Sequence, residues 1–203
     1  VEPEKGVYSQ AAIEHYRQVL LYCREREIEP VVTMHHFSSP KWLITEGGWE
    51  SDKTITFFAE YCRYVVSEIG ELMHYICTIN EANMGLQLAA LAERYLQQMQ
   101  SEMVGQSDDA NGEVQVGFNL QEMMAVLAEK TKQASIEAFG VGRPETFLSM
   151  RTAEGDQIIM RAHEAARDAM KEVNADLEIG ITLSLFDIQS AAGGEETARA
   201  AWE

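Results

Sequence analysis

Two segments of the chain carry polar residues of the kinds that do chemistry in folded proteins. Residues 34–37 read Met-His-His-Phe, and residues 78–81 read Thr-Ile-Asn-Glu. Each segment ends a short apolar run, which is typical of a buried parallel strand. In parallel α/β folds the reactive groups lie at the carboxyl ends of the strands. The imidazoles, the amide and the carboxylate of these segments are therefore the first candidates for a functional site.

Glu81 is the residue of the second segment that could transfer a proton. A carboxylic acid whose pKa is raised by partial burial can protonate a leaving-group oxygen. The alternative is structural: Asn80 caps a helix that begins near Ala82, and Glu81 complements the dipole of that helix. Four residues alone do not decide between them, because a chain of this length shows Thr-x-Asn-Glu by chance roughly a few per cent of the time.

The two histidines of the first segment cannot both serve one site. Successive residues of a strand face opposite sides, so only one of His35 and His36 can point into the mouth of a barrel. The alternative is that both are strand-end histidines bonded to neighbouring backbone groups. Position alone leaves both interpretations open.

Helices and strands alternate along the chain. Apolar residues at helical spacing, such as Ile13, Tyr16 and Leu20, predict amphipathic helices. Helices are predicted at 11–27, 51–69, 82–103, 120–139, 153–173 and after 193–194, strands at 28–37, 73–80 and 178–186, a loop at 38–50, and a strand end at Val1. Strands joined by connections long enough to contain a helix form parallel βα units.

The predicted fold class is α/β, with parallel strands alternating with helices as part of a (β/α)₈ TIM barrel. Such barrels need roughly 250 residues, so the 203 residues are expected to form one incomplete barrel domain, 1–203, with about half of the barrel present. The polar stretch 105–112 lies within one βα connection and is expected to be a surface insertion. The chain starts at Val1 without a methionine, which we expect of a portion of a longer sequence.

The charge balance argues against two classes of partner. Lys and Arg number 16 against 33 Asp and Glu, which gives a formal net charge of -17. A chain this acidic repels the phosphates of nucleic acids and gains nothing from an anionic membrane surface. No apolar run approaches the length of a membrane span. We therefore expect neither nucleic acid nor membrane as a partner.

The cysteines indicate a reducing compartment. Cys23, Cys62 and Cys77 are odd in number and widely spaced, which argues against a disulfide framework and against a metal site. Cys23 and Cys62 fall on the apolar faces of predicted helices, where a free thiol behaves as a small hydrophobe. We predict a cytoplasmic protein.

Several motifs in order resemble glycoside hydrolase family 1, the β-glucosidase family of retaining exo-glycosidases. Residues 28–40 (IEPVVTMHHFSSP) are similar to the family's IxPxVTLxHWDxP, 47–49 to its GGW, 57–62 (FFAEYC) to its FxxYA helix, and 78–81 to its TxNE. The likeness thins after residue 84 and returns at 161–163 (RAH) and 179–182 (IGIT). The order of the motifs, more than any one of them, carries the resemblance.

The resemblance implies a role for each candidate residue. Glu81 would be the general acid/base, and Asn80 would bond the sugar 2-hydroxyl, a contact that strengthens in the oxocarbenium-like transition state. His36 would bind the 3-hydroxyl, with His35 facing away. Phe37 stands where the family usually has Trp, so a ring face remains but the indole N–H donor is lost. The implied substrate is a small β-glycoside or disaccharide, without a metal or other cofactor.

Other conspicuous residues are expected to be structural. Ala82 replaces a proline that is common in the family, which we expect only to loosen the start of the helix. Trp42 and Trp49 could be sugar platforms, but packing is favoured because Trp is usually largely buried. His163 is expected to be structural. Met123-Met124 is interpreted as core filler, and Glu71, Glu93 and Asp108-Asp109 lack the spacing of metal ligands.

The second carboxylate that retaining hydrolysis requires is not evident. The nucleophile must lie about 5–5.5 Å from the acid/base, and the family places it in a Glu-Asn-Gly segment that these 203 residues do not contain. An open partial barrel exposes edge strands and an apolar inner face. We therefore expect self-association or a complementary barrel half as a partner.

Three hypotheses remain open. The chain could be the acid/base half of a β-glycosidase, or an inactive fragment or pseudoenzyme that keeps a partial sugar site. It could also be an unrelated doubly wound binding module, which the absence of a Gly-rich phosphate loop disfavours. The sequence does not distinguish glucosides from galactosides or fucosides. It also does not distinguish plain glycosides from 6-phosphoglycosides, because the family's determinants for the phosphate lie in a C-terminal third outside these residues.

Overall fold

A three-stranded parallel sheet lies at the centre of the fold. The computed structural model describes residues 1–106 and 120–185. The strands are β1 (Val31–His35), β2 (Tyr75–Ile79) and β3 (Glu178–Gly180), in the spatial order β1-β2-β3. His35 lies opposite Ile79, and Cys77 lies opposite Gly180. Because the pairing is parallel, the carboxyl ends of the strands meet at one edge of the sheet.

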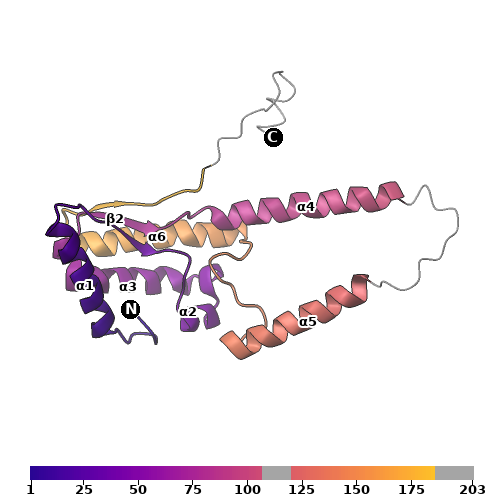
Figure 1. Ribbon diagram of the computed structural model, residues 1–203, viewed down its shortest axis with the longest axis horizontal. Coiled ribbons are helices and arrows are strands. Elements are labelled where there is room, and N and C mark those ends of the chain that lie inside the picture. Colours follow the sequence, from indigo (N-terminus) through magenta and orange to yellow (C-terminus); the bar gives the residue numbers. More distant parts are fainter. Residues whose placement is uncertain (107–119, 186–203) are drawn as a thin grey trace, which may run out of the picture.

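Helices connect the strands. They are α1 (Gln10–Arg24), α2 (Lys41–Thr45), α3 (Lys53–Ile69), α4 (Met84–Gln106), α5 (Leu120–Phe139) and α6 (Ala153–Val173), with 3-10 helices η1 (Gly48–Glu50) and η2 (Gly70–Leu72). Figure 1 shows α3 and α6 running side by side along the sheet, while α4 and α5 extend away from it. Among the described residues, no helix is both long and apolar enough to cross a bilayer.

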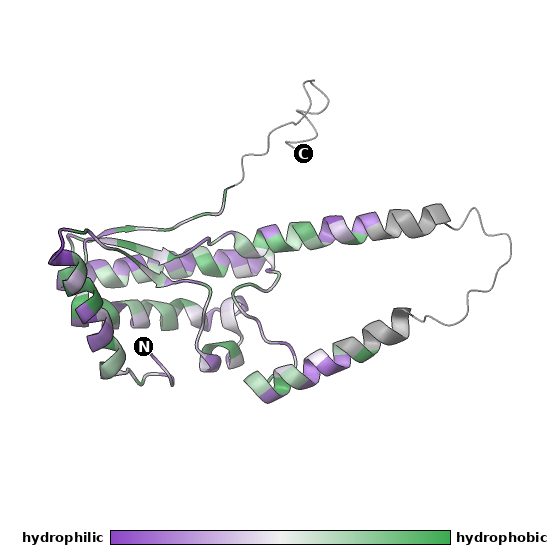
Figure 2. Ribbon diagram, viewed as in Figure 1, coloured by the Kyte–Doolittle hydropathy of each residue, from purple (hydrophilic) through white to green (hydrophobic). Residues whose placement is uncertain are grey.

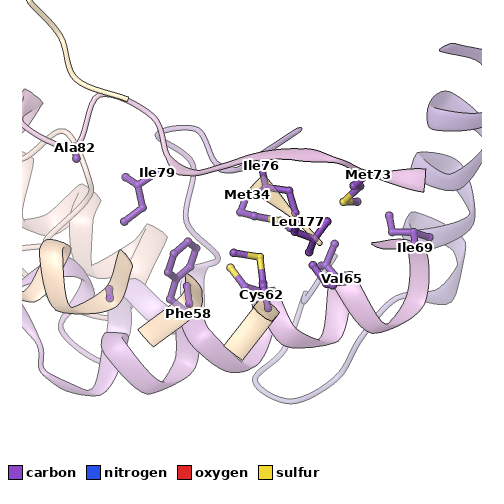
Figure 3. Close-up of a cluster of buried hydrophobic side chains, with 14 of the residues drawn as sticks. Met34, Phe58, Cys62, Val65, Ile69, Met73, Ile76, Ile79, Ala82 and Leu177 are labelled. Atoms are coloured by element: carbon purple, nitrogen blue, oxygen red, sulfur yellow. The ribbon is translucent and has the colours of Figure 1, made fainter. Parts of the chain in front are cut away.

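The core lies between the sheet and α3. Met34 of β1 and Ile76 and Ile79 of β2 face Phe58 and Cys62 of α3, and all five side chains are buried (Figure 3). Full burial of an apolar side chain of this size stabilises the fold by about 1.5–3 kcal/mol. Figure 2 shows apolar and hydrophilic residues alternating along these helices, as amphipathic helices require. This packing fixes the strand ends relative to the helices.

Small side chains let α6 approach α3 closely. Ala162, Ala166 and Ala169 of α6 are buried, and their spacing of three and four residues places them on one helix face. The helix begins at a side-chain cap: the Thr152 hydroxyl accepts a hydrogen bond from the Gly155 amide at 3.0 Å. Helix α6 thereby starts at a defined place beside the edge of the sheet that carries the candidate residues.

The predicted alternation of strands and helices is confirmed, with shifted ends. Each strand lies within a predicted strand, and each of the five longer helices overlaps a predicted helix. The loop predicted at 38–50 instead contains α2 and η1. These helices have five and three residues, which is too short for a helical period to show in the sequence.

Three expectations from the sequence differ from the structure or lie outside it. Strand β3 ends at Gly180, not at residue 186, because the residues that follow bond to the turn after β2. The strand end at Val1 is wrong, since the Val1 carbonyl accepts a hydrogen bond from the Ser9 amide at 2.8 Å, at the start of α1. Helix α4 takes in the first two residues of the proposed insertion 105–112. Its remainder, and the helix after 193–194, lie outside the described residues.

Candidate active site

The ends of β1 and β2 bring His36 and Asn80 together. The Asn80 amide nitrogen lies 3.4 Å from His36 Nε2, and the Asn80 backbone N–H donates to the His35 carbonyl at 2.9 Å. His36 is exposed, and Asn80 is half-buried. Two residues 44 positions apart in the chain thus present their polar groups at the same edge of the sheet.

Glu81 lies in a tight turn between β2 and α4. Its φ of 47° is in the left-handed region, which costs energy for a residue with a side chain and persists only where the surroundings hold it. The Glu81 N–H donates to Thr182 Oγ1 at 2.9 Å. The Thr182 hydroxyl in turn donates to Asn80 Oδ1 at 3.1 Å. One hydroxyl therefore holds both polar residues of the turn.

The prediction that Asn80 caps a helix is wrong. Helix α4 begins at Met84, and the Asn80 side chain bonds to Thr182 and His36 instead of to helix amides. The Ala82 N–H donates to the Thr182 carbonyl at 3.0 Å, a bond that proline cannot make.

His35 and His36 lie in different surroundings. The His35 ring is buried between Trp49 and Phe147, with both ring centroids 4.7 Å away. Its Nε2 lies 3.0 Å from the Ser39 hydroxyl. Burial first, and then the charge of Arg151, lowers the pKa of His35 to about 3. His35 is therefore neutral at ordinary pH and part of the core, as the alternation along the strand predicts.

Phe37 presents a ring beside the His36 imidazole. The two ring centroids are 4.9 Å apart at an interplanar angle of 78°. On its other side Phe37 stacks on the buried Phe147, with centroids 5.8 Å apart and an interplanar angle of 30°. The φ of Phe37 is 67°, so the chain reverses here as it leaves β1. The half-buried ring keeps part of its surface accessible.

The structural expectations for Trp49 and His163 are confirmed. Trp49 is only 1% exposed, and its indole N–H donates to Ser39 Oγ at 3.1 Å. Trp42 donates to the Glu2 carbonyl at 3.2 Å and packs edge-on against a neighbouring phenylalanine ring. The His163 Nδ1 lies 2.8 Å from the hydroxyl of the buried Thr78, and so supports β2 from α6.

Sequence reasoning missed the residues that hold the turn after β2. Thr182 belongs to the family-like segment 179–182, but nothing in that segment predicts which atoms it contacts. Asn83 makes two bonds to the backbone of Ser184, both at 2.8 Å. Arg151 donates to the Ala82 carbonyl at 2.7 Å from a connection that the motifs do not cover. These contacts join segments about 70 to 100 residues apart, so no local pattern reveals them.

No candidate metal centre is found in the described part of the chain. The residues of 1–106 and 120–185 contain no group of three His, Cys, Asp or Glu side chains placed to hold an ion. Glu71 instead forms an ion pair with Arg17 at 2.7 Å. The three cysteines are free, and Cys62 is fully buried in the core.

Comparisons with known proteins identify the family of this chain. Residues 2–106, more than half of the chain, match the model of glycosyl hydrolase family 1. The chain is a member of this family. The matched range includes His36, Phe37, Asn80 and Glu81.

Similar solved structures show the same fold over nearly the whole chain. The β-glycosidase BGL167 aligns with a TM-score of 0.68 and 36% identity, covering 99% of this chain and 43% of its own. A β-glucosidase named 1317 aligns with a TM-score of 0.66 and 27% identity, covering 90% of this chain and 39% of its own. This family 1 chain is thus part of a TIM barrel.

Curated relatives match a shorter range. The 6-phospho-beta-galactosidase of Staphylococcus haemolyticus is 36% identical over 76 residues, which are 37% of this chain and 16% of that protein. The chloroplastic galactolipid galactosyltransferase SFR2 of Arabidopsis thaliana is 34% identical over 84 residues, 40% of this chain and 14% of that protein. The chain therefore spans a small part of the length of these relatives.

Proposed function

We propose that this chain supplies the general acid/base and part of the sugar subsite of a retaining β-glycosidase that releases terminal β-linked sugars from small glycosides. Glu81 is the acid/base, Asn80 and His36 bind sugar hydroxyls, and Phe37 offers a ring face. The observation that carries the proposal is the 3.4 Å approach of Asn80 to His36, next to Glu81, at the carboxyl ends of adjacent parallel strands. A family 1 barrel supplies the frame.

The chemistry follows from the position of each group. In the first step the Glu81 carboxyl donates its proton to the glycosidic oxygen as the bond to the sugar breaks. In the second step the Glu81 carboxylate removes a proton from the water that releases the sugar. Asn80 has its Oδ1 engaged by Thr182, so its Nδ2 remains to donate to a sugar hydroxyl or to His36. The amide orientation is fixed before substrate arrives, which lowers the entropic cost of binding.

The nucleophile is proposed to come from a complementary part of the barrel. Retention requires a second carboxylate about 5–5.5 Å from the acid/base, and these 203 residues contain no Glu-Asn-Gly segment. β1 and β3 are the outer strands of the described sheet, so each has an edge at which further strands can pair. Pairing there would bring a second carboxylate to the same mouth.

Turnover of an aryl β-glucoside tests the proposal. Hydrolysis is measured with the 203-residue chain and with this chain co-expressed with the C-terminal half of a family 1 barrel. Glu81→Gln is expected to abolish turnover, because an amide can neither donate the proton of the first step nor remove one from the water of the second step. Glu71→Gln is the matched control, since Glu71 is an exposed partner of Arg17. Hydrolysis that survives Glu81→Gln would contradict the proposed role.

Two alternatives have a specific basis. The likeness to 6-phospho-beta-galactosidase favours a 6-phosphoglycoside as a second candidate substrate, and parallel assays with phosphorylated and plain aryl galactosides separate the two. An inactive protein with a partial sugar site is the other alternative. Sugar binding without turnover in either preparation would favour it.

The three free cysteines support a reducing compartment, and we propose that the protein is cytoplasmic.

A further inference from the structure

A buried arginine provides a second anchor, besides Thr182, for the turn that carries Glu81. Arg151 lies in the connection between α5 and α6, and its side chain is 2% exposed. Its guanidinium donates to the Ala82 carbonyl at 2.7 Å, one residue after Glu81. The Thr182 hydroxyl accepts from the Glu81 N–H at 2.9 Å, and the Thr182 carbonyl accepts from the Ala82 N–H at 3.0 Å. Thr182 thus holds the two peptide groups that flank Glu81, and Arg151 holds the next one, between Ala82 and Asn83.

The site of Arg151 is built to hold this side chain in one orientation. The guanidinium also donates to the Phe147 carbonyl at 2.9 Å and pairs with Asp156 at 3.2 Å. Two glycines leave the room it occupies: a Cβ at Gly85 would lie 2.7 Å from the Arg151 Cβ, and one at Gly155 would lie 2.6 Å from its Cγ. Three acceptors in different directions match the fork of a guanidinium, whereas the single ammonium of lysine cannot reach them all.

Arg151 also supports the ring that faces the sugar subsite. Its guanidinium lies 4.7 Å from the centre of the Phe147 ring. Phe147 is fully buried and stacks on Phe37, and it also contacts the His35 ring. Arg151 thus contacts both parts of the site: its hydrogen bond to Ala82 reaches the Glu81 turn, and its contact with the Phe147 ring supports Phe37.

We propose that Arg151 is a positioning residue of the glycosidase, which fixes the direction of the Glu81 carboxyl through the Ala82 carbonyl and supports Phe37 through Phe147. This inference rests on the proposed function and deepens it. A buried charge is costly to desolvate, and an apolar side chain of similar volume often gives a fold that is equally stable or more stable. The three hydrogen bonds of the guanidinium offset that cost, and the one to the Ala82 carbonyl orients the neighbouring turn.

The positioning role predicts a loss that depends on the leaving group. A dinitrophenolate departs without a proton, whereas an alkyl alcohol requires one, so only the alkyl glycoside depends on where the Glu81 carboxyl points. The measured quantity is kcat/KM, which reports on the first step. Arg151→Lys and Arg151→Met are expected to lower it on the order of 10²-fold for the alkyl glucoside and far less for the dinitrophenyl glucoside. Arg161→Met is the matched control, because Arg161 is an exposed residue of α6 that pairs with the exposed Asp52.

If Arg151 had a merely structural role, its substitution would lower kcat/KM for both glucosides by the same factor. That result would overturn the inference. Arg151→Met leaves the Asp156 carboxylate without its partner, which could destabilise the fold. The double variant Arg151→Met/Asp156→Asn removes that unpaired charge, so it separates loss of folding from a misdirected Glu81 carboxyl. In the same preparation, Glu81→Gln is the reference. If Glu81→Gln leaves hydrolysis of the alkyl glucoside intact, the proposed function fails. If Glu81→Gln abolishes hydrolysis of the alkyl glucoside but kcat/KM of the Arg151 variants falls by the same factor for both glucosides, only the role of Arg151 fails.

Amide hydrogen exchange tests the same inference without turnover. The backbone N–H groups of Glu81 and Ala82 are expected to exchange at least about tenfold faster in Arg151→Lys, because the turn opens locally when one of its anchors is lost. Those of Ile76 and Cys77 within β2 are expected to keep their protection. Unchanged exchange at Glu81 and Ala82, or equal acceleration throughout β2, would overturn the inference.

Discussion

The Glu81 amide donates to the hydroxyl of Thr182 at 2.9 Å, and that hydroxyl donates to the Asn80 side chain at 3.1 Å. A residue beyond β3 thus sets the geometry of two residues beyond β2. The contact satisfies the backbone of a left-handed residue and orients an amide at the same time. Preorganisation of this kind is what acid–base chemistry at a strand end requires.

Thr182→Val is expected to destabilise the protein by about 1–3 kcal/mol, because it leaves the Glu81 N–H and the Asn80 Oδ1 without their partner. Thr182→Ser keeps the hydroxyl and is expected to retain most of the stability and of the activity. Urea unfolding and kcat/KM on an aryl glucoside measure the two effects. Equal behaviour of the valine and serine variants would show that the methyl group matters and the hydroxyl does not.

Phe37→Trp is expected to improve substrate binding, since the indole N–H restores a donor that the phenyl ring lacks. One added hydrogen bond contributes about 0.5–1.5 kcal/mol, so KM is expected to fall several-fold with little change in kcat. Phe37→Leu is the control, because it removes the ring and its stacking on Phe147. A tryptophan variant with a raised KM would indicate that the site has no room for the larger ring.

Acid is expected to destabilise the fold through His35. Its pKa in the folded state is about 3, lowered chiefly by burial, against 6.5 for an ordinary histidine. Between pH 6.5 and pH 3, His35 binds a proton in the unfolded chain but stays neutral in the folded chain. Stability therefore falls as the pH drops from 6.5 towards 3, by up to about 1.4 kcal/mol per pH unit.

Replacement of His35 tests this linkage. His35→Phe is expected to flatten the dependence of urea unfolding on pH over that window. Ser39→Ala is the control: it removes the hydroxyl that lies 3.0 Å from His35 Nε2 but keeps the titrating ring, so the slope is expected to remain. An unchanged slope in His35→Phe would mean that other groups account for the acid sensitivity.

Gly48→Ala is expected to destabilise the protein more than Gly140→Ala. Both glycines have a positive φ, of 57° and 76°, so each substitution adds the backbone strain of a left-handed alanine, about 1–2 kcal/mol. A Cβ at Gly48 would also overlap the Glu145 carbonyl oxygen, whereas a Cβ at Gly140 meets nothing within 4 Å. Thermal unfolding measures the difference, and similar midpoints for the two variants would refute the steric argument.

The sequence by itself determined the alternation of strands and helices and the residues at the strand ends. Short apolar runs and helical spacing are local signals, so they predict β1 and β2 without knowledge of what packs on them. The same alternation separates His35 from His36, because neighbouring residues of a strand must face opposite ways. The ordered motifs, with Glu81 at the end of β2, were sufficient to indicate the family.

Only the tertiary structure decided what holds those residues in place. The sequence allowed Asn80 to be a helix cap, and the contact with Thr182 excludes that role. Arg151 reaches the Ala82 carbonyl across 69 residues of chain, and the end of β3 was misplaced because its continuation bonds to the same turn. Such contacts depend on distance in space and on the free hydrogen-bonding capacity of a turn. Neither quantity leaves a period or a motif in the sequence.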